Sequence, residues 1–147
     1  MSKNYIFKVT KRLRDANIAH RLLNYNGPCE NIHGHTYHFE IDISSNKLNE
    51  LGMVVDFNKI KTICDNWIQS NWDHSILIYD KDVELIDLIR KLSFGNRYFI
   101  TEFNTTAENM AKFLFEIFRN ELEKEQVKVL EVRVWETETS IATYKGE

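Results

Sequence analysis

The alternation of side chains between residues 33 and 44 is the feature that most restricts the fold of this chain. One phase of a two-residue period carries two histidines and four large apolar residues, His33, His35, Tyr37, Phe39, Ile41 and Ile43. Successive side chains of a strand point to opposite faces of the sheet. The pattern therefore predicts one long strand with an apolar face, and it places two imidazoles at the start of that face.

Shorter patterns predict the other elements. Residues 4–13, 127–136 and 139–144 alternate as strands, and 53–57 extends as a short one. Apolar residues at helical spacing predict helices over about 58–72, 82–92 and 106–124. This order predicts an α+β fold, with a four-stranded antiparallel sheet and helices on one face. The exposed edges of such a sheet favour closure by oligomerisation.

The length and charge of the chain limit its class. Its 147 residues fit one domain spanning 1–147, without repeats or linkers. No apolar run approaches the roughly 18 residues that span a bilayer, and the start does not resemble a signal peptide, so we expect a cytoplasmic protein with no membrane segment. A net charge of −3 argues against a nucleic-acid partner bound through bulk charge. The glycines form no phosphate-binding fingerprint.

Three histidines suggest a metal site. His20 precedes the long strand, and with His33 and His35 it offers three nitrogen ligands. Three protein ligands and one open position are typical of catalytic zinc. The alternative is a chance pair among the five histidines, but a histidine that continues an apolar phase without a partner is unfavourable. His38 lies on the opposite phase, and we expect it to be solvated.

The two cysteines have different surroundings in the sequence. Cys29 lies in a polar loop four residues before His33, where a nearby cation would favour the thiolate. It suits a base or nucleophile, although a lone loop cysteine often has no role. Cys64 follows the apolar face of a predicted helix, and we expect it in the core.

Acidic residues supply further candidates. Asp73 and His74 are adjacent, so they are either an oriented acid–base pair or a charge pair at a helix end. Glu136 ends an apolar row, where it either meets water at the rim of the sheet or binds two donors of a ligand. Thr105-Thr106-Ala107-Glu108 is typical of a capping box, which gives Glu108 a structural explanation.

Together these motifs resemble the 6-pyruvoyl-tetrahydropterin synthase and 6-carboxytetrahydropterin synthase family. The most specific part is Cys29-x3-His33-Gly34-His35 with an upstream Ala-His and a downstream Asp-His. Further matching pieces are Gly52-Met53-Val54-Val55-Asp56-Phe57, Thr105-Thr106-Ala107-Glu108-Asn109, Trp135-Glu136-Thr137 and Tyr144-Lys145-Gly146-Glu147. The resemblance covers nearly the whole chain.

The resemblance implies the tunnelling fold (T-fold). In this fold, units with two helices and four strands trimerise into a barrel and usually pair into hexamers, with active sites between subunits. Zinc (Zn2+) would be held by His20, His33 and His35. The substrate would be the small molecule 7,8-dihydroneopterin triphosphate.

The family also implies roles for the other candidates. Glu136 would bind the N–H groups of the pterin ring, helped by the helix start with Thr105, Thr106 and Glu108. Cys29 would move protons on the side-chain carbons of the substrate. Asp73 and His74, reaching in from a neighbouring subunit, would be its acid–base partner.

The spacing within the cysteine motif indicates a branch. A three-residue gap between Cys29 and His33 resembles the bacterial 6-carboxytetrahydropterin synthases of queuosine biosynthesis, which release acetaldehyde and triphosphate. Cys29 followed by Glu30 also resembles a branch that forms 6-hydroxymethyl-7,8-dihydropterin for folate, with Glu30 as a second base; Glu30 is otherwise an exposed loop acid. The 6-pyruvoyl-tetrahydropterin synthase reaction is a third candidate, and a non-catalytic pterin- or metal-binding module is a candidate from a different functional class.

Several positions depart from the family pattern. Ala16 and Ile18 replace the usual residues before Ala-His, and Thr105 replaces a proline. The segment 75–103 is longer than in compact bacterial enzymes, so a loop or helix there would reshape access to the site. Candidates for contacting the triphosphate are Arg12, Arg14, Arg21 and Lys145.

Overall fold

A seven-stranded mixed sheet forms the centre of the protein, in a computed structural model that describes residues 4–95 and 97–146. Glu147, the last residue of the C-terminal motif, and the first three residues of the expected domain lie outside the described residues. The strands are β1 (Phe7–Arg12), β2 (Ala16–His20), β3 (His33–Ser45), β4 (Ser75–Tyr79), β5 (Tyr98–Thr101), β6 (Lys128–Thr137) and β7 (Ser140–Tyr144).

The helices follow the predicted positions closely. α1 (Phe57–Ile60), a π-helical stretch (Lys61–Asp65) and α2 (Asn66–Asn71) run on as one helix, and α3 (Val83–Arg90) and α4 (Ala107–Leu122) are the others. Short 3-10 turns cover Pro28–Glu30 and Glu123–Glu125. The three predicted helices are therefore confirmed. In the described part of the chain, no helix has the length and apolar character to cross a membrane.

The sheet is larger than the four-stranded antiparallel sheet predicted from the sequence. Its order is β5-β4-β2-β3-β6-β7, with β1 pairing to β3. The β2–β4 and β4–β5 pairs are parallel, and the other pairs are antiparallel. The extra strands β2, β4 and β5 have only four or five residues each, too few for a clear alternation.

One predicted strand is absent. Residues 53–57 do not form a strand. Instead, the Asp56 carboxylate accepts a hydrogen bond of 2.8 Å from the backbone N–H of Asn58 and caps α1. An aspartate at this position satisfies one of the donors that the first turn leaves unpaired, so the segment leads into the helix.

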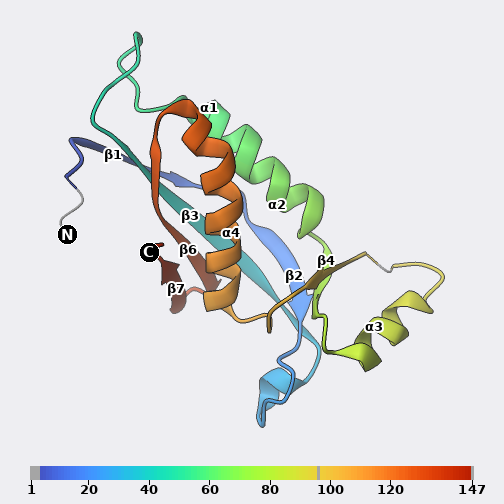
Figure 1. Ribbon diagram of the computed structural model, residues 1–147. Helices are drawn as coiled ribbons and strands as arrows, with labels where there is room; N and C mark the ends of the chain where they lie inside the picture. The colour runs from blue at the N-terminus through green and yellow to red at the C-terminus, as the bar shows by residue number, and fades with distance from the viewer. Residues whose placement is uncertain (1–3, 96, 147) are drawn as a thin grey trace.

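The long strand buries the predicted face. Tyr37, Phe39, Ile41 and Ile43 are fully buried and join the main core with side chains of α4 and of the α1–α2 helix, which lie on one side of the sheet (Figure 1). Cys64 is also fully buried in this core, as predicted.

α3 packs on the opposite face of the sheet from the two main helices, α4 and the α1–α2 helix, which share one face as predicted. In β4, Leu77 joins the main core, while Ile76 and Ile78 pack with Leu85, Ile86 and Ile89 in a second apolar cluster. Alternate side chains of one strand face opposite ways, so the two clusters lie on opposite sides. The long segment 75–103 is therefore a β4-α3-β5 unit that adds an edge and a second layer.

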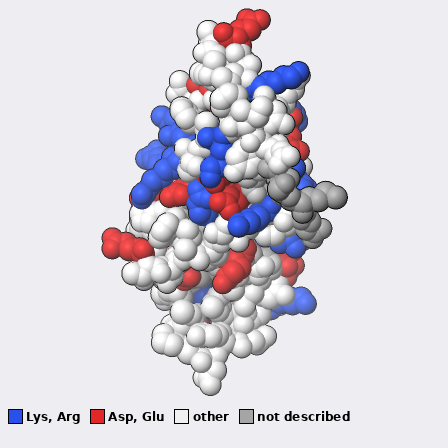
Figure 2. Space-filling view, turned by 90° about the vertical axis from the view of Figure 1, so that its left-hand side faces the viewer, with Lys and Arg blue, Asp and Glu red and all other residues white. Residues whose placement is uncertain are grey.

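A charged network lies on the face of β3 and β6 that points away from the main core. The Arg133 guanidinium donates to Asp42 at 2.7 and 2.9 Å, to Glu40 at 2.8 Å and also to Glu131. Burial by itself raises the pKa of Asp42, but hydrogen bonds from Arg133 and Thr10 outweigh it and hold that pKa below its ordinary value. Basic and acidic side chains also lie next to one another across the face shown in Figure 2.

Replacing Arg133 tests how much this network contributes to the free energy of unfolding. Asp42 is 2% exposed and without Arg133 would keep only the Thr10 hydroxyl at 2.6 Å and Lys8 at 3.5 Å. We therefore expect Arg133→Met to lower the free energy of unfolding at pH 7 by about 3 kcal/mol, the lower end of the cost of breaking a buried charge pair. A depressed carboxyl pKa contributes stability above the pKa of the unfolded state, about 3.9, and this contribution is lost as the pH falls through the folded-state pKa. The difference between the two proteins should therefore shrink below about pH 4.

Urea unfolding at a fixed protein concentration measures this difference. Lys124→Met is the control, because Lys124 pairs with Glu121 on the surface at 3.1 Å and exposed pairs contribute less than about 1 kcal/mol. Equal losses in the two variants would contradict the prediction.

Candidate metal centre and active site

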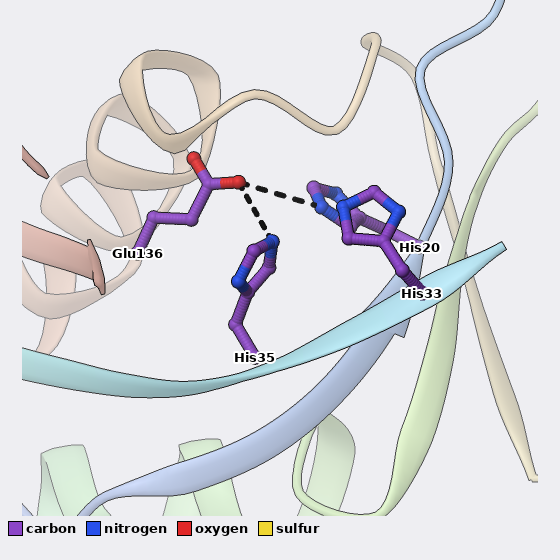
Figure 3. Close-up of side chains that lie close together, drawn as sticks. All are labelled: His20, His33, His35 and Glu136. Carbon is purple, nitrogen blue, oxygen red and sulfur yellow. Dashed lines mark ion pairs between the residues drawn. The ribbon is translucent and has the colours of Figure 1, made fainter. Parts of the chain in front are cut away.

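Three histidines and one glutamate converge where β2 and β3 meet beside the end of β6 (Figure 3). The antiparallel pairing of β2 with β3 sets His20 opposite His33, and His35 follows two residues on along the same face. One ligand atom from each of His20, His33, His35 and Glu136 lies within 4.8 Å of the others. The structure thus brings together the three histidines predicted from the sequence and adds Glu136 to them.

Hydrogen bonds orient two of the imidazoles. His20 Nδ1 lies 2.8 Å from the Thr105 carbonyl oxygen, and His33 Nδ1 lies 2.6 Å from the Asn31 carbonyl oxygen. A carbonyl oxygen only accepts, so Nδ1 carries the proton in each ring and Nε2 keeps its lone pair. Metal-binding histidines are held in this way by carbonyls or carboxylates behind them.

Two nitrogens of the cluster are buried without a hydrogen-bond partner among the described residues. They are His33 Nε2 and His35 Nε2. His35 Nε2 lies 2.9 Å from a Glu136 carboxylate oxygen, an ion-pair distance without the angle of a hydrogen bond, and His20 Nε2 lies 3.7 Å from the same oxygen. Buried polar atoms are normally hydrogen-bonded, so these unpartnered nitrogens fit a bound cation.

Burial favours the neutral form of two of the imidazoles, those of His20 and His35. It lowers the pKa of His20 to about 4, and the neighbouring His33 and His35 lower it further against the hydrogen bond to Thr105. Burial also lowers the pKa of His35, against the attraction of Glu136. Neutral imidazoles are the ligand form, so three nitrogens and a carboxylate together can hold a metal ion.

Cys29 and Glu30 have different surroundings. Both lie in the 3-10 turn Pro28–Glu30, where Cys29 is partly buried and Glu30 is exposed. Burial raises the pKa of Tyr37, and the charges of Glu136 and Cys29 add to this, while the Glu30 charge acts on Arg21. The Cys29 carbonyl accepts a hydrogen bond of 2.8 Å from the backbone N–H of Leu22, two residues after His20, so the turn is held beside the end of β2.

Asp73 and His74 form the predicted pair. His74 Nδ1 lies 2.8 Å from the Asp73 carboxylate, which also accepts from the backbone N–H of Asn17 at 2.9 Å. Burial raises the pKa of Asp73, but these two hydrogen bonds outweigh it and the pKa lies below its ordinary value. His74 has a φ of 56°, and its side chain is 74% exposed.

The Asp73–His74 pair faces a different part of the surface. His74 lines an open cavity of about 510 Å³ together with Asn17, Ala19, Thr36 and also His35 of the histidine cluster. In β2, Asn17 and Ala19 lie on the phase opposite to the buried Ile18 and His20. Among the described residues, the group that could hold a metal ion includes neither Asp73 nor His74.

The start of α4 supports the cluster from behind. Thr105 is fully buried, and both its carbonyl and its hydroxyl (3.2 Å) lie against His20 Nδ1. The helix cap is Thr106, which accepts from Asn109 N at 3.2 Å, while Glu108 is exposed. The capping box predicted from Thr105 to Glu108 is thus shifted by one residue, because Thr105 is engaged by the histidine.

Two basic candidates and one histidine have partners that the sequence did not indicate. Arg21 binds Asp82, and Arg12 contacts His38 and lies 3.7 Å from Asp15. His38 is 23% exposed and lies 2.6 Å from Asp15, so the expectation of a solvated histidine is wrong. Arg14 and Lys145 are exposed. Asp82 was missed because a single aspartate before a helix indicates only a cap.

Comparison with known proteins agrees with this arrangement. A sequence model of the family described as 6-pyruvoyl tetrahydropterin synthase matches residues 8–147. The chain belongs to this family. Proteins named 6-carboxy-5,6,7,8-tetrahydropterin synthase are similar to it: that of Rickettsia conorii is 35% identical over 133 residues (90% of this chain and 95% of the relative), and that of Haemophilus influenzae is 33% identical over 147 aligned positions (95% and 99%).

Solved structures show the same fold. The 6-pyruvoyl tetrahydropterin synthase of Caenorhabditis elegans superposes with a TM-score of 0.69 at 27% identity, covering 98% of this chain and 99% of that one. An uncharacterized protein from Wolinella succinogenes gives a TM-score of 0.84 at 22% identity, covering 96% and 98%. The 6-pyruvoyl tetrahydropterin synthase family fold, the expected T-fold, is thus confirmed, with the additional strands described above.

Metal binding can be tested with two histidine variants that both lie in β3. We expect the purified protein to bind one divalent metal ion per chain, and His33→Ala to lose it, because a site with three histidines loses a nitrogen ligand. Metal analysis after gel filtration gives the stoichiometry. His38→Ala, on the opposite face of β3, is the matched control and should keep the ion; equal metal contents in the two variants would refute the assignment.

Proposed function

We propose that this chain is a zinc-dependent 6-carboxy-5,6,7,8-tetrahydropterin synthase. It would convert 7,8-dihydroneopterin triphosphate to 6-carboxytetrahydropterin, acetaldehyde and triphosphate, as a lyase of queuosine biosynthesis in the cytoplasm. The observation that carries the proposal is the cluster of His20, His33 and His35, in which two Nε2 atoms are buried without a hydrogen-bond partner among the described residues. Relatives about 35% identical over most of the chain bear the name of this enzyme.

His20, His33 and His35 are the proposed zinc ligands. Imidazole nitrogen suits zinc, and three protein ligands leave a fourth position for the substrate. Zinc supplies Lewis acidity, which lowers the pKa of substrate hydroxyl groups. The carbonyls of Thr105 and Asn31 hold two of the rings so that Nε2 faces the ion.

Glu136 is the proposed anchor for the pterin ring. Its carboxylate is 26% exposed and lies next to the cluster, so it can accept two N–H groups of a flat ring through its two oxygens. The three residues proposed with it differ in exposure. Thr105 is buried behind His20, whereas at the helix start Thr106 is partly buried and Glu108 is exposed. The most direct substrate contact thus falls to Glu136.

Cys29 is the proposed base on the substrate side chain. Its turn is hydrogen-bonded to Leu22, two residues after the proposed ligand His20, so a thiolate there can take a proton from a carbon of a bound substrate. Cys29 is partly buried whereas Glu30 is exposed, which supports Cys29 over Glu30 as the base. The three-residue gap between Cys29 and His33 and the name of the relatives support the carboxy product.

The acid–base pair Asp73–His74 is proposed to act in the site of a neighbouring subunit. Within one chain it opens onto the other face of the sheet, and its imidazole is largely exposed. A site that combines the metal group of one chain with the exposed His74 of another would be shared between two copies, which fits a homo-oligomer, a trimer or hexamer.

Product analysis separates the candidate reactions. Incubated with 7,8-dihydroneopterin triphosphate, the zinc-loaded protein should form 6-carboxytetrahydropterin and acetaldehyde, identified by mass spectrometry. Cys29→Ala should lower kcat by at least about a hundredfold, as expected for loss of a general base, while it keeps zinc. Glu30→Gln is the matched control and should stay near the wild-type rate.

Different products would assign different functions. 6-Hydroxymethyl-7,8-dihydropterin as the main product, lost in Glu30→Gln, would assign the folate branch. A pyruvoyl product would assign the third reaction. No turnover, with zinc and pterin bound, would indicate a binding module.

Mixing variants tests whether sites are shared. Co-expressed Cys29→Ala and His74→Ala subunits should regain about a quarter of the wild-type activity, because in a closed ring a random half of the subunits meets a suitable neighbour half of the time. Cys29→Ala mixed with His33→Ala is the control and should stay inactive, since both residues belong to one chain's half of the site. No recovery in the first mixture would contradict the shared site.

A further inference from the structure

Arg21 follows His20 directly but points the other way. His20 is on the buried phase of β2 and faces the metal centre, so the next side chain leaves toward the opposite face. There the guanidinium meets Asp82, with Nε to Oδ2 and Nη2 to Oδ1 both at 2.6 Å. Such a two-pronged contact fixes direction as well as distance.

Asp82 is itself held in place. It is 3% exposed and is the N-cap of α3, where its side chain accepts from Leu85 N at 3.4 Å. Since α3 packs through Leu85, Ile86 and Ile89 on β4, the carboxylate is a rigid point in the β4-α3-β5 unit.

The backbone of Arg21 leads back to the metal centre. Its carbonyl oxygen accepts a hydrogen bond from the Thr105 hydroxyl at 3.2 Å, and the carbonyl and hydroxyl of Thr105 lie against His20 Nδ1. The next residue, Leu22, donates its N–H to the Cys29 carbonyl at 2.8 Å. Residues 20–22 thus connect the orientation of a ligand to the position of the proposed base.

We propose that Arg21 and Asp82 are positioning residues that set the orientation of His20 and the place of the Cys29 turn from the far side of the sheet. The proposal rests on the metal-dependent function proposed above. It removes Arg21 from the candidates for the triphosphate, because its Nε and Nη2 are bound to Asp82. It gives the long segment 75–103 a function in the site of its own chain.

A purely structural role predicts something different. If the pair only fastens α3 to the sheet, its loss lowers thermal stability and leaves the metal centre unchanged. If it positions His20, its loss weakens the metal and alters its coordination even where the fold is kept.

Asp82→Asn is the variant of choice, because asparagine also caps helices well while the charged pair is lost. We expect the zinc affinity, measured by competition with a chelator, to fall about tenfold, the lower end of the effect of residues behind metal ligands. The visible spectrum of the cobalt-substituted protein should change in intensity or position. Glu84→Gln, which removes an acid from the same first turn without a bond to Arg21, should match the wild type in both.

Two further variants distinguish the loss of the Arg21–Asp82 contact from misfolding. Arg21→Lys keeps the positive charge but cannot form the two-pronged contact, and it should also weaken zinc. Asp82→Asn and Arg21→Lys combined should lose little more than either alone, because both break one contact.

Wild-type zinc affinity and an unchanged cobalt spectrum in folded Asp82→Asn and Arg21→Lys would overturn the proposal. Failure of the wild-type protein to bind zinc at all would instead overturn the metal-dependent function. The two failures are therefore distinguishable.

Discussion

The pairing of β2 with β3 is the contact on which the candidate site depends. It places His20 opposite His33, although His33 comes thirteen positions later in the sequence, beyond a loop and a turn. A shift of one residue would turn His33 and His35 to the opposite face. The fully buried row from Tyr37 to Ile43 excludes this shift, because it would expose the main core. The apolar core thus fixes the register, and the register builds the cluster of ligands.

The two faces of the sheet separate the chemistry. His20 faces the main core and the proposed metal, whereas Arg21 and the Asp73–His74 pair belong to the side on which α3 packs. In the proposed function this division explains why an oligomer is needed. Each chain presents its metal ligands on one face and its Asp73–His74 pair on the other. It also explains how a unit added at the sheet edge can contact the residue next to a ligand.

Much of this was predictable because it rests on local periodicity. The alternation after residue 33 predicted the buried face, and helical spacing predicted α3, α4 and the α1–α2 helix. Strands β2, β4 and β5 were missed because each is too short for a period and is stabilised by neighbours distant in sequence. Residues 53–57 were mistaken for a strand because Asp56 acts as a helix cap only in the folded context.

The sequence by itself determined the ligand types: a His-x-His pair on one strand face, an upstream histidine and a cysteine close by. Only the tertiary structure decided that Thr105 orients His20, that Cys29 is partly buried while Glu30 is exposed, and that Asp82 holds Arg21. The physical reason is the distance in sequence between the residues that interact. Strand alternation depends on consecutive residues, whereas a hydrogen bond from a side chain to a group 61 or 85 positions away in the sequence forms only after the sheet has formed.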